Sequence, residues 1–171
     1  MKQAASLLFL VREGEILLAM KKRGFGKGRW NGVGGKPEGG ESIEDTAIRE
    51  CQEEISVTPM QLQHVANLTF KMHESDKYYK ELNADVFVSR QWKGEPTETD
   101  EMAPKWFKLD EIPYDSMWAD DIFWLPEVLK GNFVTATFHF DENDQVINQQ
   151  IIVRTVEWLV TPPGFEPRAF P

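Results

Sequence analysis

Apolar positions follow the period of strands over most of the chain. Residues 6–23, SLLFLVREGEILLAMKKR, hold two apolar runs around the polar segment REGE, where Gly14 provides the backbone freedom of a tight turn. This segment therefore predicts two strands joined by a turn. Further strands are predicted in LQHVANLTFKM, LNADVFVSRQW and KWFKLDEIP, and a final hairpin is predicted from FVTATFHF and QVINQQIIVRTVE across DEND.

Two segments have the spacing of helices instead. From Ser42 to about Ile55 an apolar position recurs at every fourth residue, which predicts a helix with one buried stripe, formed by Ile43, Ala47, Cys51 and Ile55. Ser42 followed by Asp45 is typical of a helix start, and Pro59 is expected to help end the helix. A second helix is predicted in DDIFWLPEVLKG, residues 120–131.

A glycine-rich segment precedes the first predicted helix. Eight of the twelve glycines lie in residues 24–40, GFGKGRWNGVGGKPEGG. Helices do not tolerate this density of glycine, and a long strand is disfavoured as well. The segment is therefore predicted to be a shaped loop, with a short strand around residues 30–33. GEPTETDEMAP, residues 94–104, is predicted to be an acidic loop.

Length and charge restrict the partners of the chain. The 171 residues suffice for one compact domain, predicted over residues 1–156, followed by a proline-rich tail over residues 157–171 that is expected to be extended or disordered. A net charge of −9 disfavours nucleic-acid polymers and anionic membranes as partners. A single cysteine fits a reducing compartment, and the apolar run at the start is read as a strand rather than a signal peptide. We expect a cytoplasmic monomer.

Three glutamates crowd into the segment RECQEE, residues 49–54. On a helix, Glu50, Glu53 and Glu54 share one face within about one turn, where Arg49 can reach Glu53. One interpretation is a solvated acidic face. The other is a divalent cation, since carboxylate oxygens are the ligands that Mg²⁺ and Mn²⁺ prefer.

The glycine-rich loop and the acidic helix together resemble the Nudix box. The box requires a glycine, then Glu after five residues, then Arg-Glu after seven more, then two adjacent glutamates. In this chain those positions are filled by Gly35, Glu41, Arg49, Glu50, Glu53 and Glu54. Two positions depart from the pattern. Cys51 replaces a large aliphatic residue, and Ser56 stands where glycine is usual.

This resemblance implies a fold and a chemistry. The fold is α/β, a sandwich of helices on both faces of a central mixed β-sheet. The activity is the hydrolysis of a nucleoside diphosphate linked to another group, with Mg²⁺ as cofactor and Mn²⁺ as a second possibility. The resemblance implies that the metal ligands are Gly35, Glu50, Glu53, Glu54 and Glu101. The catalytic residues implied are Arg49, Glu50, Glu53 and Glu54, and it stays open whether Glu53 or a residue outside the helix accepts the proton.

A second resemblance concerns the substrate. The segments MKKRGFGKGRWNGVGGK and DEMAPKWFKLDEIPYDSMWADD are similar to those of the MutT-type oxidised purine nucleoside triphosphatases within the Nudix family. The implied substrate is a small-molecule nucleotide such as 8-oxo-dGTP or 2-hydroxy-dATP. The substrate-binding residues implied are Ser6, Lys21, Phe25, Asn31, Phe70, Trp118, Asp120, Asp121 and Phe138.

Each of these residues also has a structural interpretation. Asp120 and Asp121 are placed to begin a helix, where acids suit the positive end of the dipole. Trp118 suits a core position, as do the strand residues Phe70 and Phe138, and Asn31 beside glycine suits a turn. If the aspartates are instead paired in a pocket, their repulsion favours one of them holding a proton and donating to a base edge.

Three functions are consistent with these patterns. The first is hydrolysis of oxidised purine nucleoside triphosphates to the monophosphate and pyrophosphate, which removes damaged nucleotides from the pool. The second is the same chemistry on another nucleotide, such as a methylated purine nucleotide, an ordinary nucleoside triphosphate or a nucleotide sugar. The third is a non-catalytic nucleotide-binding module, which the three retained glutamates disfavour.

Overall fold

The computed structural model describes residues 2–74 and 80–156. In chain order, the elements are β1 (Lys2–Arg12), β2 (Glu15–Lys21), β3 (Trp30–Asn31), α1 (Ile43–Ile55), β4 (Thr58–Met60), β5 (Gln63–Lys71), β6 (Glu81–Ser89), β7 (Gln91–Lys93), β8 (Met102–Lys108), the 3₁₀ turn η1 (Tyr114–Ser116), α2 (Asp121–Leu129), β9 (Asn132–Phe140) and β10 (Val146–Thr155). The predicted tail, residues 157–171, lies outside the described residues.

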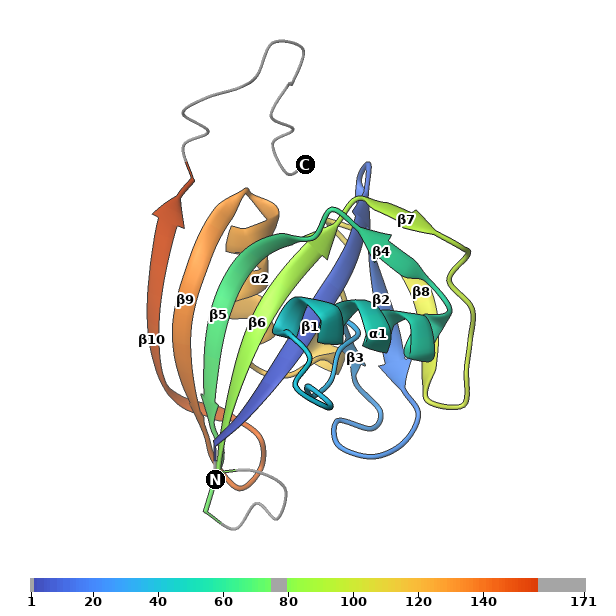
Figure 1. Ribbon diagram of the computed structural model, residues 1–171. Helices are drawn as coiled ribbons and strands as arrows, with labels where there is room; N and C mark the ends of the chain where they lie inside the picture. Colours follow the sequence, from blue (N-terminus) through green and yellow to red (C-terminus); the bar gives the residue numbers. More distant parts are fainter. Residues whose placement is uncertain (1, 75–79, 157–171) are drawn as a thin grey trace.

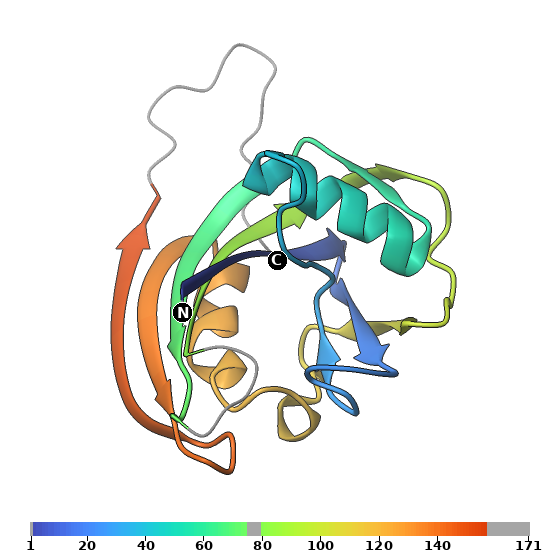
Figure 2. The same cartoon turned by 60° about the horizontal axis from the view of Figure 1, so that its bottom comes forward.

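The main sheet is mixed, and a helix covers each of its faces. Its strands follow the order β10-β9-β5-β6-β1-β2-β3, with β8 also paired to β2. The pairs β1–β6 and β5–β9 are parallel, whereas the other pairs are antiparallel. Helix α1 lies on one face near β1 and β2, and α2 lies on the other face, inside the curve of the sheet (Figures 1 and 2). The expected sandwich around a mixed sheet is confirmed.

Strand β1 is the centre of this arrangement because both of its faces are buried. Leu8 and Leu10 belong to the core beneath α1, whereas Phe9 and Val11 belong to the core beneath α2. A strand buried on both faces needs a continuous apolar run rather than alternation, which is what SLLFLV provides.

The glycine-rich loop packs directly on the backbone of β1. The Leu8 amide donates to the Val33 carbonyl oxygen at 2.7 Å, and the Val33 amide donates back to the Leu8 carbonyl oxygen at 3.0 Å. A Cβ on Gly34 would collide with the carbonyl group of Ser6. Glycine is therefore required here by close approach of two backbones, which brings the loop beside the central strand.

Helix α1, with Ser42 as its N-cap and Ile55 as its last residue, has the predicted bounds. The Ser42 hydroxyl oxygen accepts a hydrogen bond from the Asp45 amide at 3.1 Å. The helix ends at Ser56, whose φ of 63° is left-handed, and the Ser56 amide donates to the Gln52 carbonyl oxygen at 3.1 Å. Pro59, which was expected to help end the helix, follows this cap and lies in β4.

Most of the predicted strands are confirmed, with two differences in their bounds. The segment predicted to run on to Trp92 is divided into β6 and β7, and β7 pairs with β4 in a separate two-stranded sheet. Strand β8 begins at Met102, inside the segment predicted to be an acidic loop, because it pairs with β2 as far as Lys21.

Within residues 2–74 and 80–156, no helix has the length and apolar character needed to cross a bilayer.

The backbone of Ser56 leads to a prediction about stability. Replacing Ser56 by glycine removes the steric cost of a left-handed conformation, so the free energy of unfolding should rise by about 0.5–1 kcal/mol. Urea denaturation of the wild type and Ser56→Gly measures the change. As a control, Glu44→Gly in the first turn of the same helix should be destabilising. A Ser56→Gly protein no more stable than the wild type would contradict this interpretation.

Candidate active site

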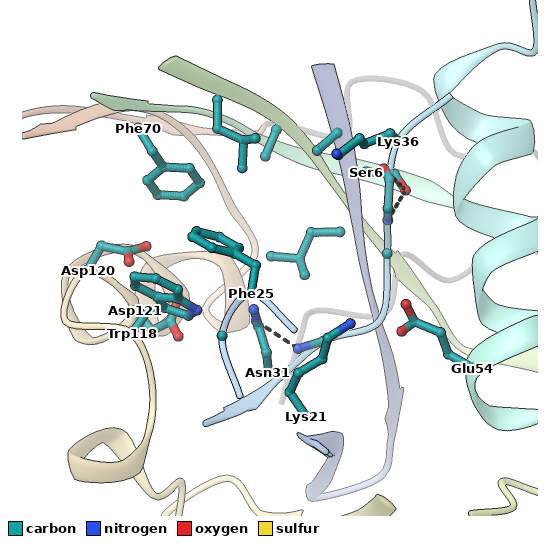
Figure 3. A pocket seen from close by; sticks show the side chains of 18 of the residues that line it. Ser6, Lys21, Phe25, Asn31, Lys36, Glu54, Phe70, Trp118, Asp120 and Asp121 are labelled. Carbon is teal, nitrogen blue, oxygen red and sulfur yellow. Dashed lines mark hydrogen bonds between the residues drawn. The ribbon is translucent and has the colours of Figure 1, made fainter. Parts of the chain in front are cut away.

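A single cavity of about 520 Å³ contains most of the residues predicted to bind substrate. Its walls come from β1, β2, β5, β6, α1, the glycine-rich loop and the segment before α2. The predicted residues that line it are Ser6, Lys21, Phe25, Asn31, Phe70, Trp118, Asp120 and Asp121. Figure 3 shows the aromatic side chains and the two aspartates at one end and Glu54 at the other. The cavity therefore has an aromatic end and an acidic end.

Three carboxylates meet at the acidic end. Within the described part of the chain, ligand oxygens of Glu50, Glu54 and Glu101 lie within 4.8 Å of one another. Glu54 is only 3% exposed, and its Oε2 atom has no hydrogen-bond partner among residues 2–74 and 80–156. A buried carboxylate oxygen without a partner is costly, so this group has the chemistry of a site for a hard divalent cation.

The structure does not bring Glu53 into this group. The Glu53 side chain is 59% exposed, and its carboxylate accepts a hydrogen bond from Arg49 at 3.2 Å. Glu101, which is far from the helix in sequence, occupies the third position of the acidic group. Of the four glutamates expected as ligands, the structure thus gathers Glu50, Glu54 and Glu101 and leaves Glu53 outside the group.

Arg49 holds the acidic end in place. Its guanidinium donates to Glu41, to Glu50 at 3.0 Å and to the Lys36 carbonyl oxygen at 3.0 Å. The hydrogen bonds from Arg49 lower the pKa of Glu41 to about 2, and Glu41 in turn raises the pKa of Arg49. Sequence reasoning placed Glu41 in the Nudix box but assigned it no role; it anchors the arginine that orients Glu50.

Gly35 leaves room for the carboxylate of Glu50. A Cβ at this position would collide with the Glu50 carboxylate. The Gly35 carbonyl oxygen accepts a hydrogen bond from the Ser6 amide at 2.8 Å, so β1 fixes the orientation of this peptide. The glycine of the box is therefore explained by close contact with the acidic group.

Crowding changes the ionisation of the acidic group. Burial is the main cause that raises the pKa of Glu54 to about 9; Lys21 opposes the shift, and the neighbouring Glu101 and Glu50 add to it. Burial also raises the pKa of Glu50. Removing these carboxylates from water while they repel one another favours their neutral forms. A bound cation would remove that penalty, so the donor set fits a divalent ion.

Lys21 lies between the two ends of the cavity. It lines the cavity and forms an ion pair with Glu101 at 3.6 Å. Of the neighbouring cations, Lys22 donates to a different carboxylate, Glu98, at 2.8 Å, whereas Arg23 lies 3.9 Å from the same Glu101. Of the basic run at residues 21–23, only Lys21 contributes to the lining of the cavity.

The aromatic end is built around Trp118. The ring centroids of Trp118 and Phe25 are 5.1 Å apart, and Phe140 meets the indole edge-on at 5.9 Å. Asn31 lies near this end, and its Oδ1 atom accepts a hydrogen bond from the Gly32 amide at 2.8 Å. Asn31 therefore serves the local backbone while its side chain lines the cavity.

Asp120 and Asp121 are buried rather than solvated at the start of α2. Asp120 makes no side-chain cap bond; instead, its Oδ2 atom accepts from the Trp124 indole N–H at 2.7 Å. Asp121 Oδ2 has no hydrogen-bond partner in the described part of the chain. Burial raises the pKa of Asp120 to about 6, and burial together with the charge of Asp120 raises the pKa of Asp121 well above its usual value. The pair thus favours a shared proton at neutral pH.

Phe138 is not on the cavity wall. It is fully buried in the core beneath α2, where Phe70 and Phe123 stack against it with centroids 6.1 Å and 6.5 Å away. Phe140, two residues further along β9 and on the same face, lines the cavity instead. The period of the strand predicts the face, but only the tertiary structure shows which residue on that face reaches the cavity.

Comparisons with known proteins agree with this architecture. A family model described as the NUDIX domain matches residues 1–128. A Danio rerio protein named oxidized purine nucleoside triphosphate hydrolase is 40% identical over 146 residues, which cover 85% of this chain and 92% of that protein. A Mus musculus protein of the same name is 38% identical over the same shares of both chains.

Solved structures show the same fold. A MutT protein from Bacillus halodurans superimposes with a TM-score of 0.76 at 25% identity, covering 87% of this chain and 97% of that chain. A MutT NUDIX hydrolase from Burkholderia pseudomallei gives a TM-score of 0.59 at 28% identity, covering 66% of this chain and 88% of that chain.

The buried aspartates predict a pH dependence of stability. An acid whose pKa is raised on folding stabilises the folded state below its unfolded pKa and loses this contribution as the pH rises through its folded pKa. The unfolding free energy of the wild type should therefore fall from about pH 4 to pH 8. Asp121→Asn should flatten the profile and be more stable than the wild type at pH 8, because the buried charge of the pair is then reduced.

Denaturant titrations at several pH values measure this difference. Asp115→Asn, at an exposed aspartate of the preceding turn, is the control and should follow the wild-type profile. Parallel profiles for the wild type and Asp121→Asn would show that the aspartate pair does not carry a raised pKa.

Proposed function

The chain belongs to the Nudix family, and we propose that it hydrolyses oxidised purine nucleoside triphosphates to the monophosphate and pyrophosphate. One observation carries the proposal: a single cavity runs from Glu54, one of a group of three carboxylates, to an aromatic end with two buried aspartates. This arrangement suits a ligand with a charged phosphate chain at one end and a planar base at the other. The names of the Danio rerio and Mus musculus relatives support this choice of substrate.

Glu50, Glu54 and Glu101 would hold the metal, for which we propose Mg²⁺. The fit rests on the buried, unpartnered Oε2 atom of Glu54 and on the oxygen-only donor set. The ion supplies charge neutralisation of the phosphates and a lowered pKa of attacking water. Gly35 supports the group by leaving space for Glu50 and offers a carbonyl oxygen beside it.

Two further residues of the helix have different roles: Arg49 orients the neighbouring glutamates, and Glu53 accepts a proton. Arg49 fixes Glu50 and Glu53 at 3.0 Å and 3.2 Å, while its own position is set by Glu41. Glu53 is the carboxylate on this helix face that stays open to solvent, and we assign it the proton from attacking water. Lys21, paired with Glu101 inside the cavity, places a cation beside the phosphate chain.

The base would lie at the aromatic end. Trp118 offers a planar surface for stacking, and Phe25 and Phe70 complete an apolar slot. Asn31 offers a donor and an acceptor to a base edge. Of the aspartate pair, the carboxyl that keeps its proton donates a hydrogen bond and the ionised one accepts, so the pair presents both functions to an oxidised purine.

Ser6 completes the wall between the two ends. Its hydroxyl lies 3.4 Å from both the amide nitrogen and the carbonyl oxygen of Gly35. The hydroxyl therefore has capacity left for a ligand. Phe138 supports the base site from behind by packing on Phe70 rather than by touching the base.

Substrate preference is tested by a panel of nucleotides. The wild type is assayed with Mg²⁺ on 8-oxo-dGTP, 2-hydroxy-dATP, O6-methyl-dGTP, dGTP, dATP and dCTP, with pyrophosphate and phosphate measured separately. We expect the highest kcat/KM for an oxidised purine and release of pyrophosphate. Equal rates across the panel would favour a different nucleotide substrate, and no turnover of any member would favour a binding module.

Replacing Trp118 by alanine tests base stacking. The substitution should raise KM for the preferred oxidised purine by about tenfold, since stacking on an aromatic side chain contributes about 1–3 kcal/mol, and should change kcat/KM for dCTP much less. Trp92→Ala is the matched control, because Trp92 stacks on Trp106 outside the cavity at 5.7 Å. An equal effect of Trp118→Ala on all nucleotides would contradict base stacking.

A further inference from the structure

An arginine covers the indole of Trp118 from outside the cavity. The guanidinium carbon of Arg29 lies 4.1 Å from the centroid of the Trp118 ring, within the range of a cation–π contact. Trp118 and Phe25 line the cavity, whereas Arg29 does not. The indole is therefore held between a fixed cation on its outer side and the cavity on its inner side.

An ion pair between segments distant in sequence fixes this arginine. Arg29 Nη2 donates to Asp144 Oδ2 at 3.0 Å, across 115 positions of the chain. Both side chains are about one third exposed, at 30% and 33%. The pair joins the glycine-rich loop to the turn between β9 and β10.

The turn that presents Asp144 is itself ordered by hydrogen bonds. Asp144 has a φ of 58°, and its amide donates to the Asp141 carbonyl oxygen at 3.1 Å. Asp141 Oδ1 accepts from the amides of Asn143 and Gln145 at 2.8 Å and 3.0 Å. Aspartate tolerates the left-handed conformation better than most residues, so the turn holds the Asp144 carboxylate without need of glycine.

The loop that carries Arg29 is ordered as well. The Arg29 carbonyl oxygen accepts from the Lys21 amide at 3.1 Å, and the Arg29 amide donates to the Gly26 carbonyl oxygen at 3.2 Å. A Cβ on Gly26 would lie 3.3 Å from the indole nitrogen of Trp118, so this loop contacts the indole through both its backbone and its arginine.

From these contacts we propose that Arg29, held by Asp144, is a positioning residue for the base site. It fixes the orientation of the Trp118 indole before the ligand binds, so that less side-chain entropy is lost on binding. The proposal rests on the proposed function, in which Trp118 stacks on the base. It predicts that loss of Arg29 weakens binding of the base and leaves the acidic end unaffected.

A second arginine on a tryptophan provides the matched control. The guanidinium carbon of Arg12 lies 3.8 Å from the Trp106 ring centroid, and Arg12 pairs with Glu15 at 2.9 Å. The contact type is the same, yet this pair is local in sequence and neither Arg12 nor Trp106 lines the cavity. Loss of the Arg12 side chain should therefore remove packing on Trp106 and leave ligand binding unchanged.

The experiment measures binding of 8-oxo-dGMP by calorimetry without added divalent cation. The proteins are the wild type, Arg29→Ala, Arg29→Lys, Asp144→Asn, Arg29→Ala with Asp144→Asn, and Arg12→Ala. We expect Arg29→Ala to raise Kd about five- to tenfold, Arg29→Lys to recover part of this loss, and Asp144→Asn to raise Kd about two- to threefold. The double variant should bind no more weakly than Arg29→Ala, and Arg12→Ala should bind as the wild type does.

Kinetics and stability separate positioning from a general loss of structure. With the preferred triphosphate, Arg29→Ala should raise KM while kcat changes less than about twofold, since the acidic end is untouched. Its melting temperature should match that of Arg12→Ala. Wild-type Kd in Arg29→Ala, or an equal rise in Kd for Arg12→Ala, would overturn the positioning role. A wild type that binds no 8-oxo-dGMP would overturn the proposed function and this inference with it.

Discussion

The repulsion among Glu50, Glu54 and Glu101 is the constraint on which the structure of the site depends. Three carboxylates within 4.8 Å, one of them nearly inaccessible to solvent, are unfavourable unless something compensates for their charge. The protein supplies only part of that compensation, through Arg49 on one side and Lys21 on the other. A bound divalent cation would supply the remaining positive charge that offsets the repulsion among the carboxylates. Gly35 and Glu41 follow from the same constraint, since one leaves room for Glu50 and the other anchors Arg49.

The fold turns this local constraint into a two-ended site. Strand β1 is buried on both faces, so it can carry the acidic helix on one side and the aromatic core with α2 on the other. The glycine-rich loop lies against the same strand and reaches both ends of the cavity, with Gly35 at the acidic end and Phe25 at the aromatic end. The distance between the acidic end and the aromatic end is thus set by the central strand, with the loop fitted to it.

Periodicity and motif spacing predicted much of this from the sequence. The apolar run of β1, the capped start of α1 and the register of the Nudix box all depend on neighbouring residues, so they can be read locally. Two features depend on contacts between distant segments and could not be read this way: Phe140 rather than Phe138 reaching the cavity, and Arg29 pairing with Asp144. The place of Glu101 beside the helix glutamates was expected from the family resemblance rather than from local spacing. The end of α1 was predicted near Ile55, but its cap was not, because Ser56 adopts a left-handed conformation that its residue type does not indicate.

Divalent-cation binding in the absence of nucleotide tests the central claim most directly. Mn²⁺ titration followed by electron paramagnetic resonance is applied to the wild type, Glu54→Gln, Glu53→Gln and, as a control on the exposed part of the same helix, Glu44→Gln. The account predicts that Glu54→Gln lowers the affinity at least about tenfold, in line with losing one charged ligand, whereas Glu53→Gln changes it far less and Glu44→Gln does not change it. Unchanged Mn²⁺ affinity in Glu54→Gln would contradict the claim that the buried carboxylates are gathered to hold a metal ion.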